Sequence, residues 1–146
     1  SSGLSLTQEN ERRFRENLRR ELGMAAYAIK MKPKIEELLN QHDVLVIDGL
    51  YSWAEYLFLK EEFPDLILIN IFAEPQKRYD RLSKRPIRPL SINEARERDI
   101  AEIDKLDKGG PIAIADYLIE NNGDDLPSFY QKIDFFLSRI GVSYSQ

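Results

Sequence analysis

Residues 42–63 read HDVLVIDGLYSWAEYLFLKEEF, and this stretch decides the fold that the sequence predicts. Residues 44–47 are apolar at every position and rich in β-branched side chains, which is typical of a strand covered by helices on both faces. Asp48 and Gly49 end this strand, and residues 52–63 then have the composition of a helix. A buried strand followed directly by a helix indicates an α/β protein.

The same alternation of strand and helix continues along the chain. A second apolar strand is expected at 66–72, after the Pro64-Asp65 stop, and a third, short strand at 115–121. Ser91 and Glu94 form the pattern of a capping box at a helix start. Helices are expected at 7–22, 24–40, 52–63, 75–85, 91–105 and 124–141.

Strands that alternate with helices pair in parallel through right-handed crossovers. The predicted fold is therefore a three-layer α/β/α sandwich with a parallel sheet, formed as a single domain over residues 3–141. Three strands make a thin sheet, since doubly wound sheets have about five or six. We therefore expect that strands are missing at the amino end. Ser1 and Ser2 are set aside as a remnant of expression.

Composition excludes several classes of protein. The 146 residues are 42% hydrophobic and include no cysteine, which rules out disulfides, thiolate metal sites and a cysteine nucleophile. His42 is the only histidine, so a multi-histidine zinc site is excluded. A net charge of -4 argues against nucleic-acid binding, and no apolar run is long enough for a membrane span. We expect a cytoplasmic protein, and its oligomeric state stays open.

A basic segment near the middle of the chain could bind an anion. Arg78, Arg81 and Arg85 follow at helical spacings of three and four, a proline-bounded loop comes next, and Arg96 and Arg98 lie on the capped helix. This arrangement indicates a hinged lid, at about 75–108, that could close guanidinium groups over a phosphoryl group. The alternative is a surface hairpin held by ion pairs within its helices, such as Glu94 with Arg98.

Asp48 is the second candidate for a functional residue, as an acid that could hold magnesium. A carboxylate at the end of a parallel strand lies at the sheet edge where ligands of such folds bind, although Asp-Gly is also a common turn. In P-loop phosphotransferases an acid in this place holds the magnesium shell. The glycine-rich loop G-x-x-x-x-G-K-[ST] that such enzymes need does not occur in this sequence.

Several motifs occur together in the order of a known family. These motifs are GLSLTQEN, LRRELGMAAYA, VLVIDGLYSWAEYLFLKEEF, RYDRLSKR, ERDIAEID and AIADYLIENNG. The chain resembles the dephospho-CoA-kinase-like nucleotide kinases, P-loop NTPases whose less characterised branch is often labelled AAA-family ATPase or nucleotide kinase-like. The resemblance covers residues 3 to 140. It implies that a first βαβ unit of about 40 residues, including the P-loop, is absent from this chain.

The resemblance implies ATP and Mg²⁺ as cofactors and transfer of a γ-phosphoryl group to a nucleotide-like small molecule. Asp48 matches the acid near magnesium, which it would hold through water, and near the acceptor. Arg85 and Arg98 match catalytic lid arginines that stabilise charge on the transferring group. Because residues 1–146 lack the P-loop, we expect them to be inactive alone.

Other positions match binding residues of the family. Arg81 and Arg85 match nucleotide-binding arginines, and Asn121, Asn122 and Gly123 fall in the loop that approaches the adenine. Arg19 falls in the acceptor-binding region, and Tyr51 stands where relatives tend to have arginine. The acceptor could be dephospho-CoA, a nucleoside monophosphate or another compound. The alternative function is a non-catalytic regulatory domain that binds a nucleotide or anion on the same fold.

Overall fold

The computed structural model describes residue 17 and residues 20–142. The chain divides into two compact units, one ending at Leu66 and the other beginning at Ile67. Each unit is described by itself. In the described residues, no helix combines the length and the apolar character that crossing a membrane requires.

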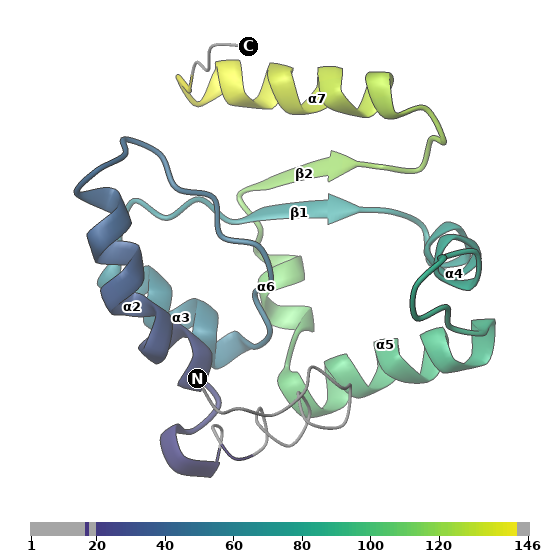
Figure 1. The fold of residues 1–146 in the computed structure, drawn as a ribbon, viewed down its shortest axis with the longest axis horizontal. Coiled ribbons are helices and arrows are strands. Elements are labelled where there is room, and N and C mark those ends of the chain that lie inside the picture. The colour runs from purple at the N-terminus through teal and green to yellow at the C-terminus, as the bar shows by residue number, and fades with distance from the viewer. Residues whose placement is uncertain (1–16, 18–19, 143–146) are drawn as a thin grey trace. The chain divides into compact units, whose positions relative to one another are not determined.

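The described part of the first unit contains the helices α2 (Ala26–Leu39) and α3 (Trp53–Glu62), which pack against each other (Figure 1). Its core contains Ala28 and Ile35 of α2 and Leu59 of α3. Half-buried apolar residues surround this core, namely Leu45, Leu50, Phe58, Phe63 and Leu66. The helix α2 continues through Pro33, which is exposed, as one helix within the predicted range 24–40.

The prediction of a strand at 44–47 is wrong. These residues have no regular secondary structure, and Val46 is 83% exposed. A strand requires a neighbour whose backbone N–H and C=O groups pair with its own. Within the described residues, the only strand pairing is that of the second unit, so the apolar pattern at 44–47 has no ladder partner.

The second unit has a two-stranded parallel sheet, formed by β1 (Ile69–Phe72) and β2 (Tyr117–Glu120). The register pairs Ile69 with Tyr117 and Phe72 with Glu120. Both strands are shorter than predicted, but their existence and parallel pairing confirm a mixed α/β arrangement. Between them lie α4 (Pro75–Ser83), α5 (Ile92–Leu106) and the short α6 (Gly109–Ala113), which lies outside the predicted helix ranges.

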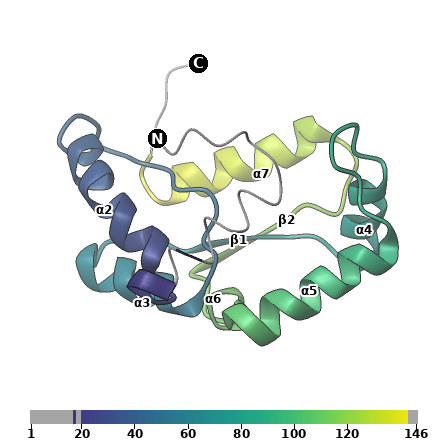
Figure 2. The same ribbon diagram turned by 60° about the horizontal axis from the view of Figure 1, so that its bottom comes forward.

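The sheet is covered on one face by α7 (Leu126–Arg139), as Figures 1 and 2 show. Ile119 of β2 and Phe136 of α7 are buried, and the rings of Tyr117 and Phe136 meet edge to face with centroids 4.9 Å apart. Leu118 points to the opposite face of the strand and is 61% exposed.

Candidate functional site

Asp48 lies in the first unit, on an exposed turn that follows residues 44–47. Gly49 has a φ of +95°, a conformation that side chains other than glycine rarely adopt. The hydroxyl of Tyr51 lies only 3.0 Å from the place where a Cβ on Gly49 would stand. The Tyr51 ring also packs on Tyr27, with centroids 5.9 Å apart. Tyr51 therefore lies over the turn that carries Asp48.

Hydrogen bonds at the start of α3 hold the backbone that directly follows this turn. Ser52 is the N-cap of α3 and its Oγ accepts the Glu55 backbone N–H at 3.2 Å. The same hydroxyl donates to the Met24 carbonyl at 3.0 Å. Glu55 is 2% exposed, and its carboxylate accepts the Tyr51 N–H at 2.8 Å. Glu55 was not among the residues predicted from the sequence; its place three residues after a serine, the capping-box spacing, was the available signal.

The donor set at Asp48 fits magnesium in part. An exposed carboxylate is the oxygen ligand that Mg²⁺ takes, usually with one or two carboxylates and several waters or phosphate oxygens. Among the described residues, no three His, Cys, Asp or Glu side chains gather into a metal cluster.

In the second unit, the structure brings together three of the predicted nucleotide-binding residues. The Arg81 guanidinium donates to the backbone carbonyl of Asn121, at 2.7 Å, and to that of Gly123. It also forms an ion pair with Asp124 at 3.6 Å. Arg81 of α4 thus holds the loop that follows β2.

Asn122 connects the same loop to the start of α4. Its side-chain carbonyl accepts the Glu74 backbone N–H at 2.7 Å, and its amide donates to the Glu74 carboxylate at 3.1 Å. The amide also donates to the carboxylate of Glu120 at 2.9 Å. These contacts join the carboxyl end of β2 to the amino end of α4.

The two predicted catalytic arginines each bind within their own segment. Arg85 donates to the carbonyls of Ile87 and Arg88, at 3.3 and 3.2 Å, and so closes the turn after α4. Arg98 donates to Glu102 at 2.9 Å, four residues further along α5. Glu102 also accepts a hydrogen bond from Lys108 at 2.8 Å.

The pKa of Glu102 reflects these contacts. Partial burial raises the pKa of Glu102, but hydrogen bonds from Lys108 and Arg98 outweigh it and hold the pKa below its ordinary value. The helix α5 therefore contains an ion pair of the expected kind, between Arg98 and Glu102. The expected ion pair of Glu94 with Arg98 does not form, because Glu94 caps α5 together with Ser91.

Asp99 of α5, which was not among the residues predicted from the sequence, binds side chains of α4. Asp99 accepts two hydrogen bonds from the Arg78 guanidinium, at 2.9 and 2.7 Å, and one from the Tyr79 hydroxyl at 2.9 Å. Partial burial raises the pKa of Asp99, but the hydrogen bonds from Arg78 and Tyr79 outweigh it. The pKa of Asp99 therefore lies below its ordinary value.

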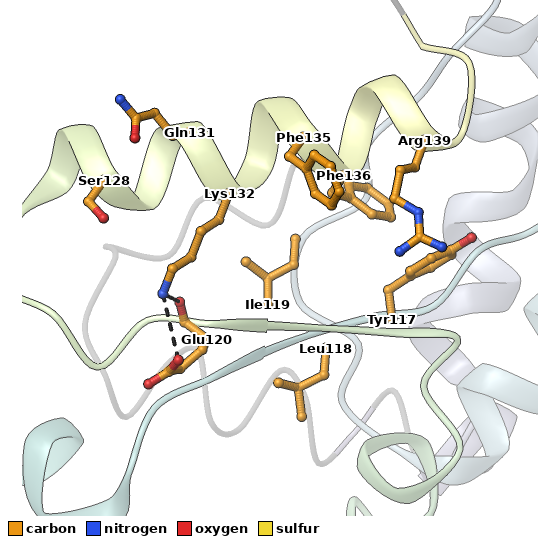
Figure 3. A pocket seen from close by; sticks show the side chains of 10 residues that line it. All are labelled: Tyr117, Leu118, Ile119, Glu120, Ser128, Gln131, Lys132, Phe135, Phe136 and Arg139. Carbon is orange, nitrogen blue, oxygen red and sulfur yellow. Dashed lines mark hydrogen bonds and ion pairs between the residues drawn. The ribbon is translucent and has the colours of Figure 1, made fainter.

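The second unit also has a shallow groove between β2 and α7 (Figure 3). Lys132 crosses it and donates to the Glu120 backbone carbonyl at 3.0 Å. Phe135 is 66% exposed there, with the Arg139 guanidinium 6.0 Å from the centre of its ring. None of the predicted site residues lines this groove.

The predicted site residues are thus distributed over both units. Asp48 and Tyr51 belong to the first unit, and the lid arginines and the loop after β2 belong to the second. Arg19, predicted to bind the acceptor, lies outside the described residues.

Comparison with known proteins identifies close relatives. No family model matches the chain. A UPF0200 protein of Thermococcus sibiricus is 38% identical over 144 residues, which span 96% of this chain and 75% of the relative. A UPF0200 protein of Thermococcus onnurineus is 38% identical over 124 residues, or 82% of this chain and 66% of the relative. One from Pyrococcus abyssi is 32% identical over 142 residues, or 94% of this chain and 75% of the relative. With this identity across nearly its whole length, the chain belongs to the UPF0200 family.

Proposed function

We propose that the protein is an ATP-dependent phosphotransferase of the nucleotide kinase class. The observation that carries the proposal is the cluster formed by Arg81 with Asn121 and Gly123. These residues are far apart in the sequence, and the resemblance to nucleotide kinases assigned all three to one nucleotide site. Their contact in the structure supports that assignment.

The proposal includes a three-layer fold with a larger sheet. Ile69 and Ile71 of β1 are 38% and 49% exposed, and the apolar residues 44–47 have no strand partner in the described part of the chain. In the described residues β1 has one strand neighbour, β2, so the backbone groups of its other edge could pair with a further strand. We propose that the full-length protein supplies this strand together with the phosphate-binding loop, and that residues 1–146 are inactive alone.

The residues of this chain would act by charge and position. Asp48 would hold magnesium through water, and bound magnesium would neutralise charge on the phosphates. Arg85 and Arg98 would exchange their present contacts for oxygens of the transferring group, because guanidinium forks match phosphate oxygens and keep their charge. Tyr51, beside Asp48, would contact a nucleotide-like acceptor such as a nucleoside monophosphate or dephospho-CoA.

The test uses the full-length protein with magnesium-ATP. Thermal denaturation should show stabilisation of about 2.7 kcal/mol at 100 times the dissociation constant. Transfer of labelled γ-phosphate to a panel of nucleotides and dephospho-CoA should then identify the acceptor. Binding without transfer would favour a non-catalytic regulatory domain that binds nucleotide. Unchanged stability with magnesium-ATP would refute the kinase and favour a non-catalytic domain that binds another anion.

Arg85 can be tested in the same protein. Arg85→Ala should reduce turnover more than nucleotide affinity, because a lid arginine acts chiefly in the transition state. Lys84→Ala is the matched control, since it removes an adjacent exposed positive charge. Equal effects of the two substitutions on turnover would contradict a catalytic role for Arg85.

A further inference from the structure

In the second unit, α4 is attached to the sheet and α5 is attached to α4, by different kinds of contact. α4 is fixed to the carboxyl end of the sheet by Arg81, which binds the carbonyls of Asn121 and Gly123, and by the paired contacts of Asn122 with Glu74. These contacts join the segment after β1 to the segment after β2. Movement of α4 away from the sheet would break all of them together.

Few apolar contacts hold α5 in place. Ala95 is the only residue of this helix that is buried, while Ile92, Ile100 and Ile103 are 47%, 51% and 55% exposed. α4 has no buried residue to offer it. Elements with little buried apolar surface open at lower free energy than the rest of a domain.

The polar attachment of α5 to α4 is concentrated on one carboxylate. Asp99 accepts hydrogen bonds from both terminal nitrogens of the Arg78 guanidinium and from the hydroxyl of Tyr79. Other ion pairs of α5 join it to itself or to the residue before α6, as Arg98 and Lys108 do with Glu102. Asp99 is therefore the side chain of α5 whose hydrogen bonds join this helix to α4.

Both ends of α5 have backbone conformations suited to a hinge. Among the described residues, Arg88 and Asp107 are the non-glycine residues with positive φ, at 53° and 50°. One precedes α5 and the other caps its end. Residues in sparsely populated backbone regions cluster at switch segments, and hinges are a few loop or helix-end residues that absorb changes in φ and ψ.

We propose that α5 alone is the moving part of the 75–108 lid: it swings between Arg88 and Asp107 and is held shut on α4 by Asp99. α4 stays with the sheet. Arg98, adjacent to Asp99, moves with α5, whereas Arg85 remains near the end of α4. The motion of α5 does not require the protein to be a kinase. Only the role of α5 as a lid over a bound nucleotide rests on the proposed function.

The test is amide hydrogen exchange of the full chain, read by mass spectrometry. Asp99→Asn keeps the shape of the side chain but removes its charge. Exchange across 92–106 should accelerate by about fivefold, since hydrogen bonds to a partly exposed charged group are lost, while 75–83 and 117–120 keep their rates. Asp104→Asn is the control, because it removes an exposed charge of the same sign from the same helix.

Two results would overturn the inference. One is unchanged exchange in 92–106, and the other is equal acceleration in α4 and α5, which would mean that the two helices move together. Tyr79→Phe removes one hydrogen bond from Asp99 and decides the matter if Asp99→Asn unfolds the protein. Its smaller acceleration should also be confined to 92–106.

Addition of magnesium-ATP to the full-length wild-type protein separates this inference from the proposed function. Slower exchange in 92–106 with nucleotide would support the lid role. No effect of nucleotide would count against the proposed function only, because the comparison of variants without nucleotide tests the motion of α5 directly.

Discussion

Ser52 is where a single hydroxyl should have the largest effect on the first unit. It is 1% exposed, caps α3 by accepting the Glu55 N–H, and donates to the carbonyl of Met24. Ser52→Ala removes both interactions. Loss of an N-cap costs about 1 kcal/mol, and loss of a buried hydrogen bond costs about as much again. We therefore expect the free energy of unfolding of this unit to fall by about 2 kcal/mol.

Urea denaturation followed by tryptophan fluorescence measures this change. Trp53 is the only tryptophan, begins α3 and stacks on Tyr56 with ring centroids 5.4 Å apart, so its emission reports on the first unit. With a urea slope of about 2 kcal/mol/M, the midpoint should fall by about 1 M.

Two variants separate the contributions. Ser52→Gly should lose only a few tenths of a kcal/mol as a cap but the whole Met24 bond, so it should be about half as destabilising as Ser52→Ala. Glu61→Ala, an exposed change on the same helix, should stay within about 0.5 kcal/mol of wild type. If Ser52→Ala were no worse than Glu61→Ala, a stabilising role for the Ser52 cap would be refuted.

Two further predictions concern the turn at Asp48 and the pH dependence of the second unit. Gly49→Ala should destabilise the first unit by more than the roughly 1 kcal/mol that a positive φ alone costs, because the new Cβ would meet the Tyr51 ring. Gly23 has a φ of +78° and open space around it, so Gly23→Ala measures the cost of φ alone in the same denaturation assay. Asp99→Asn should lower the free energy of unfolding by about 1 kcal/mol at pH 7, a modest value because Arg78 is 39% exposed. Since folding lowers the pKa of Asp99, its contribution is present above the ordinary value of 3.8 and is lost as pH falls through the lower folded value. Denaturation curves of wild type and Asp99→Asn should therefore converge at acid pH, and a difference that persists there would contradict the ion-pair explanation.

Local patterns predicted local structure well in this protein. The capping box of Ser91 and Glu94 is present as expected, and both strands of the sheet lie within the predicted ranges. The capping box depends on two side chains that are three residues apart in the sequence. The strands depend on a run of apolar residues, which the sequence shows directly. The 44–47 strand failed because apolar character does not supply a partner strand.

Contacts between distant residues could not be predicted from the sequence in the same way. Asp99 reads as one more charge on an amphipathic helix, and only the turn after α4 brings it to Arg78 and Tyr79. Arg81 was predicted to bind nucleotide, and the sequence did not indicate that its guanidinium also donates to backbone carbonyls in the loop after β2. Which partner an arginine finds depends on the three-dimensional path of the chain.

The parallel pairing of β1 with β2 also has a consequence for how this part of the chain folds. The two strands are separated by the whole of 73–116, so no ladder bond between them forms until that segment has closed its loop. Such pairing is entropically expensive early in folding, and non-local contacts of this kind slow folding. The helices between the strands are local and form faster. Refolding of the second unit should therefore show helical signal before its sheet is complete, with edges of β1 and β2 open to aggregation in the interval.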